Sequence, residues 1–183
     1  MLKTIYFDNM ENEVLKAIRE RRSIRRYLPE QIKEEELKAV LEAGTWAPTG
    51  KGTQDPLIIA VQNPAVCDVL RELNAEVIGN NDIDPYYGAP TIVLVFSDAS
   101  NPNWVKDGSL VIGNMLLAAH SIGLGSCWVN RCQEMFDMEK GRLLRPEFGI
   151  PDNYEGVGSI ALGYIGHAAP APRPRKEDYY KII

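Results

Sequence analysis

Residues 104–122 form the segment that most limits how this chain can fold. Its apolar residues occupy nearly every side of a helix: Val105, Leu110, Val111, Ile112, Met115, Leu116, Leu117, Ala118 and Ala119. Such a helix lies at the centre of a protein or in a contact between subunits, because no side of it suits water. We therefore predict a central helix over Trp104–Ile122, ended by Gly123. We also predict an obligate dimer, because the helix is too apolar for a monomer surface.

Short apolar runs on both sides of this segment predict strands. Thr91–Phe96 is apolar or β-branched throughout, which is typical of a strand buried on both faces. Strands are predicted over 57–61, 91–96, 126–129 and 157–164. Helical spacing of apolar residues predicts helices over 11–18 with a continuation into 19–26, and over 33–47, 64–77 and 134–145. This order of elements indicates an α+β protein.

The length of 183 residues allows one domain with a single core. We expect one domain over 1–183, with an N-terminal extension over 1–10 and an extended, Pro-rich C-terminal arm over 168–183.

A hydrophobic fraction of 45% and a net charge of −5 exclude a mainly disordered chain. No stretch has the length of a membrane helix. Three cysteines without CxxC spacing predict a reducing compartment, and hence a cytoplasmic protein.

The strongest local signal is a run of arginines over 19–26. Five of the chain's eleven arginines lie in these eight residues, together with Ser23. Guanidinium groups suit phosphate because they can donate two parallel hydrogen bonds to it. A solvated end of a helix is the competing interpretation, since cations are favoured at helix C-termini. The acidic composition argues against a nucleic-acid partner.

A second unusual segment is Ala47–Gln54, a polar, glycine-containing turn between a predicted helix and a predicted strand. Loops of this kind on a rigid scaffold often bind ligands. A plain connection between the two elements explains the composition equally well.

Motifs for other chemistries are absent from the sequence. It has two histidines, His120 and His167, and no cluster of metal ligands, so we predict no metal site. It has no Walker A motif, no GxSxG motif and no dinucleotide fingerprint in a βαβ context. Such a chain suits an enzyme whose cofactor carries the chemistry. The arginine run would then hold the phosphate of that cofactor.

Several motifs, in this order, resemble the FMN-dependent nitroreductase family. They are Arg21–Tyr27, Ala47–Gly50, Asp107–Asn114, Leu116–His120, Gly123–Trp128, Ala161–Tyr164 and Pro174–Lys176. The resemblance covers the chain from about Glu13 onward. It implies an α+β fold with a central, mostly antiparallel sheet flanked by helices. It also implies a domain-swapped C-terminal arm and a homodimer with two FMN sites between the subunits.

The resemblance implies a role for each candidate residue. Arg21, Arg22 and Ser23 would hold the phosphate and ribityl chain of FMN. Arg25 would lie at the pyrimidine edge of the flavin and stabilise its anionic reduced form. The residues implied from the other subunit are Pro48, Thr49, Gly50 and Gln54. The remaining implied contacts are Cys127, Trp128 and Val129 along the flavin and Arg175 or Lys176 at the phosphate.

The implied activity is hydride transfer from NADH or NADPH through FMN to a nitroaromatic, a quinone or a similar small acceptor. Because no separate nicotinamide site is evident, donor and acceptor would use one flavin site in turn, by a ping-pong mechanism. Three alternatives stay open: an FMN-binding module without turnover, a small anion- or RNA-binding protein, and a flavin-consuming or dehalogenating relative. We expect no membrane partner.

Overall fold

The structure, a computed structural model, describes residues 12–169 and 171–183. The predicted extension over 1–10 lies outside these residues. One four-stranded sheet has the order β1-β2-β4-β3, with every neighbouring pair antiparallel. Its strands are β1 Leu57–Val61, β2 Thr91–Asp98, β3 Gly125–Val129 and β4 Tyr154–Gly163. The helices are α1 Glu13–Glu20, α2 Glu34–Thr45, η2 Gly50–Gly52, α3 Pro64–Ile78, α4 Trp104–Ser121, α5 Cys132–Asp137 and α6 Glu139–Glu147. The predicted α+β class and antiparallel sheet are confirmed.

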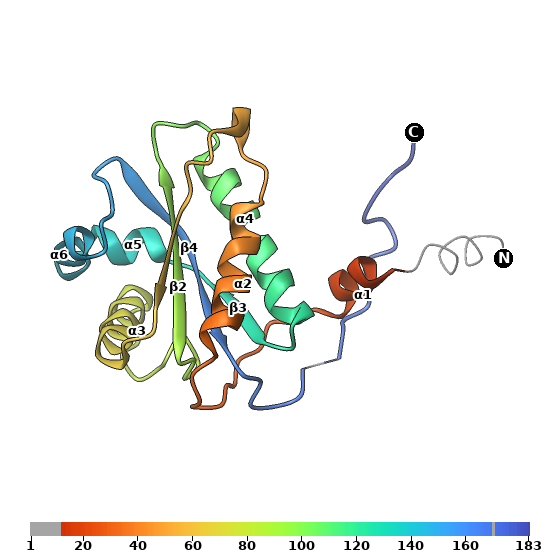
Figure 1. The fold of residues 1–183 in the computed structure, drawn as a ribbon, viewed down its shortest axis with the longest axis horizontal. Helices are drawn as coiled ribbons and strands as arrows, with labels where there is room; N and C mark the ends of the chain where they lie inside the picture. The colour runs from red at the N-terminus through yellow and green to blue at the C-terminus, as the bar shows by residue number, and fades with distance from the viewer. Residues whose placement is uncertain (1–11, 170) are drawn as a thin grey trace.

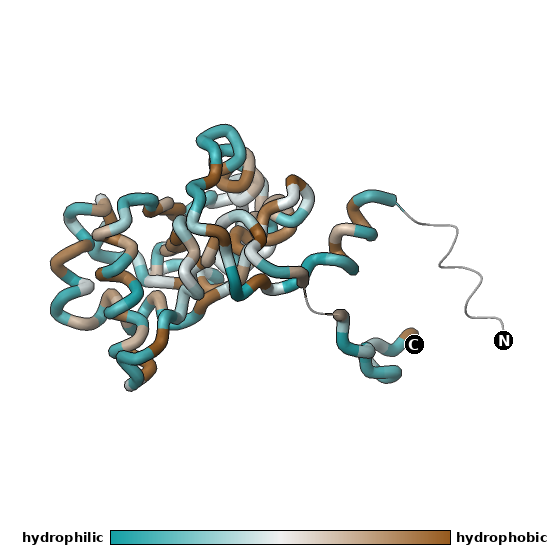
Figure 2. Tube along the Cα trace, turned by 90° about the horizontal axis from the view of Figure 1, so that it is seen from below, coloured by the Kyte–Doolittle hydropathy of each residue, from teal (hydrophilic) through white to brown (hydrophobic). Residues whose placement is uncertain are grey.

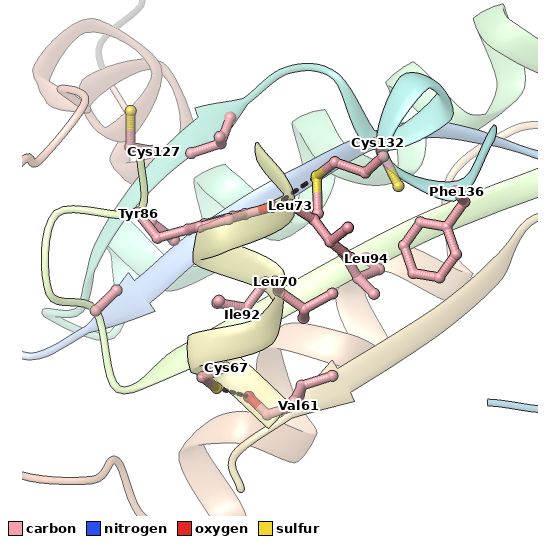
Figure 3. Close-up of a cluster of buried hydrophobic side chains, with 14 of the residues drawn as sticks. Val61, Cys67, Leu70, Leu73, Tyr86, Ile92, Leu94, Cys127, Cys132 and Phe136 are labelled. Carbon is pink, nitrogen blue, oxygen red and sulfur yellow. Dashed lines mark hydrogen bonds between the residues drawn. The ribbon is translucent and has the colours of Figure 1, made fainter. Parts of the chain in front are cut away.

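The sheet separates two layers of helices. Figure 1 shows α2 and α4 on one face and α3, α5 and α6 on the other. Strand β2 is buried along nearly its whole length, as predicted, because its apolar side chains alternate between the two cores. Figure 3 shows the core on the α3 side, with Leu70, Leu73 and Phe136 among its buried side chains. In this core Phe96 and Phe136 meet edge to face, with ring centroids 4.9 Å apart.

The apolar helix predicted over 104–122 is α4. It buries Val111, Ile112 and Met115 against the sheet and α2. The two helices approach closely at Gly44, where a Cβ atom would lie 2.9 Å from the Met115 side chain. On the opposite side Leu110 remains 48% exposed, so one chain leaves part of this apolar helix uncovered.

The prediction that the first helix continues into 19–26 is wrong. Helix α1 ends at Glu20, and the arginine run that follows is extended and lies along the free edge of β3. The backbone N–H of Ile24 donates to the Ser126 carbonyl at 3.0 Å. The side chains of Ile24 and Tyr27 are buried in the core. An extended segment satisfies the unpaired groups of the β3 edge, which a helix cannot do.

The single helix predicted over 134–145 is also wrong. The chain forms α5 and α6, separated by Met138, whose backbone is extended with φ −69° and ψ 153°. Helix α6 folds back so closely that a Cβ atom on Gly141 would overlap the Met135 carbonyl. The break lets Met138 pack against the α3-side core. The helical spacing of apolar residues in the sequence does not reveal such a break.

A buried polar network joins the loop after α3 to the end of β3. The Ser159 hydroxyl donates to the Val129 carbonyl at 2.9 Å, which leaves its oxygen to accept from the Tyr86 hydroxyl at 3.0 Å. The Asn74 amide donates to the Asn130 carbonyl at 3.0 Å. Burial raises the pKa of Tyr86, so the phenol stays protonated and can donate. The network fixes where β3 ends.

We expect Tyr86→Phe to lower the free energy of unfolding by about 1 kcal/mol, because it removes the short hydrogen bond to Ser159, together with the longer contacts of the hydroxyl to Asn74 and Met135, and keeps the ring. Urea denaturation would measure the change, provided that the dependence of the unfolding free energy on urea concentration is the same in both proteins. A loss above about 3 kcal/mol would contradict this account, since it would mean that the ring itself had repacked.

Candidate cofactor site

The structure places Arg21, Arg22 and Ser23 where α1 meets the β3 edge. Ser23 forms a parallel bridge with Ser126, so the arginine run passes directly beside the strand that carries Cys127. Arg21 and Arg22 are half-buried and Arg25 is exposed. One chain therefore brings the arginine run and β3 side by side, and the run is a strand-like segment and not the end of a helix.

Two guanidinium nitrogens in this group lack partners among the described residues. Arg21 Nη1 and Arg22 Nε are both buried, and neither makes a hydrogen bond within that part of the chain. Arg22 Nη1 is satisfied by the Arg19 and Arg21 carbonyls, each at 2.7 Å. Burial lowers the pKa of Arg21; Cys127 partly offsets this effect and the charge of Arg22 adds to it. Two adjacent, partly desolvated cations with free donors favour an anionic ligand.

A hollow of about 290 Å³ adjoins the run and is lined by Ser23, Ile24, Arg25, Arg26, His167 and Ala168. His167 and Ala168 reach it because the Gly166 N–H donates to the Arg26 carbonyl at 2.9 Å. Sequence reasoning assigned them no part in the site, and no local pattern would have revealed them. The volume of this hollow is at the lower limit of the range of about 300–1,000 Å³ that is typical of ligand pockets. One chain therefore supplies part of a pocket for a ligand the size of a dinucleotide or a flavin.

The three candidate residues on β3 differ in what they can offer. Cys127 and Val129 are buried in the α3-side core. Trp128 is half-buried on the other face, where its indole lies against the position of Gly158 and allows no side chain there. Only the β3 backbone and Trp128 can therefore face a ligand without a rearrangement of the core.

The loop that carries Pro48, Thr49, Gly50 and Gln54 lies at the far end of α4 from the arginine run (Figure 1). Helix α4 has 18 residues, a length of about 27 Å. The Gly50 N–H donates to both carboxylate oxygens of buried Asp107 at 3.1 Å, which fixes the loop to the start of α4. One chain does not bring this loop to the arginine run.

Arg175 and Lys176 are exposed in the segment after β4. Figure 2 shows this segment and α1 extending from the same side of the body. Neither residue lines the hollow beside the arginine run of its own chain.

An apolar hollow of about 470 Å³ lies between α1, α2 and α4. It is lined by Glu13, Val14, Ala17, Ala43, Trp46, Asn114, Leu117, Ala118 and Ser121. Trp46 is 79% exposed and Val14 61%. Exposed apolar side chains gathered in this way mark a contact surface.

Across residues 12–169 and 171–183, no helix combines the length and apolar character needed to cross a bilayer. In the same residues, no three His, Cys, Asp or Glu side chains come together as metal ligands. The three cysteines are free and buried.

Comparison with known proteins adds a family and solved relatives. The nitroreductase family model matches residues 18–164. A Methanothermobacter thermautotrophicus protein, provisionally named NADH dehydrogenase/NAD(P)H nitroreductase, is 31% identical over 97% of this chain and 88% of its own length. A nitroreductase from Bacteroides fragilis, solved with bound FMN, has 32% identity and a TM-score of 0.87 over 94% of this chain and 100% of its own. An FMN-bound nitroreductase from Desulfitobacterium hafniense has 26% identity and a TM-score of 0.86 over 95% of this chain and 100% of its own.

Proposed function

The chain belongs to the nitroreductase family, and from this premise we propose that it is an FMN-dependent oxidoreductase. It would transfer a hydride from NADH or NADPH to a nitroaromatic, a quinone or a similar small acceptor. The observation that carries the proposal is the pair of buried nitrogens on Arg21 and Arg22 that have no partner in the described residues. The FMN bound by similar solved structures supports the choice of anion.

The residues present fit FMN. Arg21, Arg22 and Ser23 would hold its phosphate and ribityl chain, since they combine free guanidinium donors with a hydroxyl. Arg25 would lie at the pyrimidine edge, where a cation stabilises negative charge on the ring. When bound, FMN supplies the two-electron chemistry. The protein residues then hold the ligand, orient it and bias its charge, which agrees with the absence of a local acid or base motif in the sequence.

We propose that the site is completed by a second copy of the chain. The loop with Pro48, Thr49, Gly50 and Gln54 lies too far from the arginine run of its own chain to share a ligand with it, and the hollow beside that run is small. The uncovered apolar surface over α1, α2 and α4 supplies a contact for the partner. The arm over 168–183 would cross to the partner and bring Arg175 or Lys176 to the phosphate, while the β3 backbone and Trp128 would line the ring.

The visible spectrum of the purified protein tests this function. We expect the absorption bands of oxidised flavin, release of FMN on heating, and steady NADH or NADPH oxidation with a nitroaromatic or quinone. A colourless protein that gains no flavin when supplied with FMN would refute the proposal. FMN binding without nicotinamide oxidation would instead identify a non-catalytic FMN-binding module.

Initial rates measured at several fixed acceptor concentrations should give parallel double-reciprocal lines. The reason is that donor and acceptor would occupy the same position in turn, because the sequence offers no separate dinucleotide motif. Intersecting lines would show that both substrates bind together and would require a second site.

A further inference from the structure

The turn from Asp84 to Gly88 is held rigidly. The Asp84 carboxylate accepts from the N–H groups of Tyr86 at 2.8 Å and Gly88 at 2.5 Å. Arg71 Nε lies 3.4 Å from the same carboxylate, and Arg71 Nη2 donates to the Ala89 carbonyl at 2.7 Å. Tyr86 is fully buried and bound to Ser159, so the residue after it is presented from a fixed position.

That next residue, Tyr87, has an unfavourable backbone conformation. Its φ is +58°, in the left-handed region that bulky side chains avoid. Its side chain is 37% exposed and is absent from both hydrophobic cores. A large aromatic residue held in a conformation that suits glycine, without a place in either core, indicates a requirement for its side chain.

The side chain of Tyr87 contacts Arg25. The Arg25 guanidinium carbon lies 5.8 Å from the centroid of the Tyr87 ring, within the range of a cation–π interaction. The interaction with Tyr87 is the main cause that raises the pKa of Arg25. Both side chains are exposed, and the contact restricts a long arginine side chain that would otherwise move freely in water.

We propose that Tyr87 is a positioning residue that holds the Arg25 guanidinium toward the flavin ring and thereby sets the preference of the site for reduced over oxidised FMN. The inference rests on the proposed function and extends it to a residue of the 84–88 turn. Tyr87 acts through Arg25, so its effect should vanish when Arg25 is absent.

A thermodynamic cycle with Arg25 tests this role. Redox titration of the FMN-loaded protein would compare the parent with Tyr87→Leu, Arg25→Ala and the double variant. We expect Tyr87→Leu to reduce the preference for reduced FMN about tenfold, which lowers a two-electron potential by about 30 mV. The double variant should match Arg25→Ala alone. Tyr87→Phe, which keeps the ring face, should retain most of the parental potential.

A second measurement needs no flavin. Because glycine relieves the left-handed conformation, the apo-protein with Tyr87→Gly should have a melting temperature no lower than that of the apo parent. After loading with FMN, the same variant should show the lowered potential expected of Tyr87→Leu. A lower melting temperature would assign Tyr87 a structural role and overturn the inference. An unchanged potential in Tyr87→Leu, or shifts that add in the double variant, would also overturn it. A parent that binds no FMN would refute the proposed function itself.

Discussion

Replacement of Arg21 by alanine is expected to weaken FMN binding by roughly ten- to a hundredfold. If Arg21 donates to the phosphate, its removal loses a charge-assisted hydrogen bond of about 1.5–3 kcal/mol, and each 1.4 kcal/mol is about a tenfold change in affinity. The structure supports a large effect because the Arg21 guanidinium is half-buried and Nη1 has no partner in the described residues. Titration of the apo-protein with FMN, followed by flavin fluorescence, would measure it.

Riboflavin supplies the ligand control because it lacks the phosphate. Its affinity should be weak in the parent and almost unchanged by Arg21→Ala. The matched protein control is Arg142→Ala, which removes an exposed arginine from α6, on the face of the sheet opposite α2 and α4. This control should change FMN affinity by less than about 0.5 kcal/mol. Equal losses for FMN and riboflavin in Arg21→Ala would show that the residue supports the fold, and the phosphate assignment would fall.

The central helix and the four strands were predictable because their signals are local. The apolar run of β2 and the all-round apolar pattern of α4 each require burial wherever the chain folds. The conformation of the arginine run was not predictable in the same way. Its hydrogen bond from Ile24 to Ser126 joins residues about a hundred positions apart, and helical spacing of apolar residues in 11–18 cannot reveal an edge strand elsewhere.

Some residues of the candidate site could likewise be predicted from local sequence, and others could not. The chemical type of Arg21, Arg22 and Ser23 predicts a phosphate ligand without any tertiary information, although the same residues also suit a solvated helix end. Tyr87 and His167 approach the run only through tertiary contacts, so residue type and spacing gave no signal for them. The distance between Gly50 and the arginine run is likewise set by the length of α4 and by the Asp107 contact at its start.

A mixed dimer of two defective chains is expected to recover FMN binding that neither chain shows alone. One chain would carry Arg21→Ala. The other would carry Gly50→Val, because a side chain at Gly50 would lie 2.6 Å from the Asn103 amide, so that the loop and Asn103 cannot both keep their positions. In a dimer whose sites are shared, one site receives both defects. The other combines the unchanged arginine run of one chain with the unchanged loop of its partner.

The two chains, co-expressed with different affinity tags and purified through both, should therefore bind one FMN per dimer, about half a flavin per chain. The affinity of that site should equal the parent's, while both homodimeric variants bind weakly. Sites built within single chains would each keep one defect, so the mixed dimer would show no tight site at all. Sedimentation of the parent as a stable FMN-loaded monomer would contradict the shared site more directly. The exposed Trp46 and Val14 would then need another partner, and the loop at Gly50 could take no part in holding the cofactor.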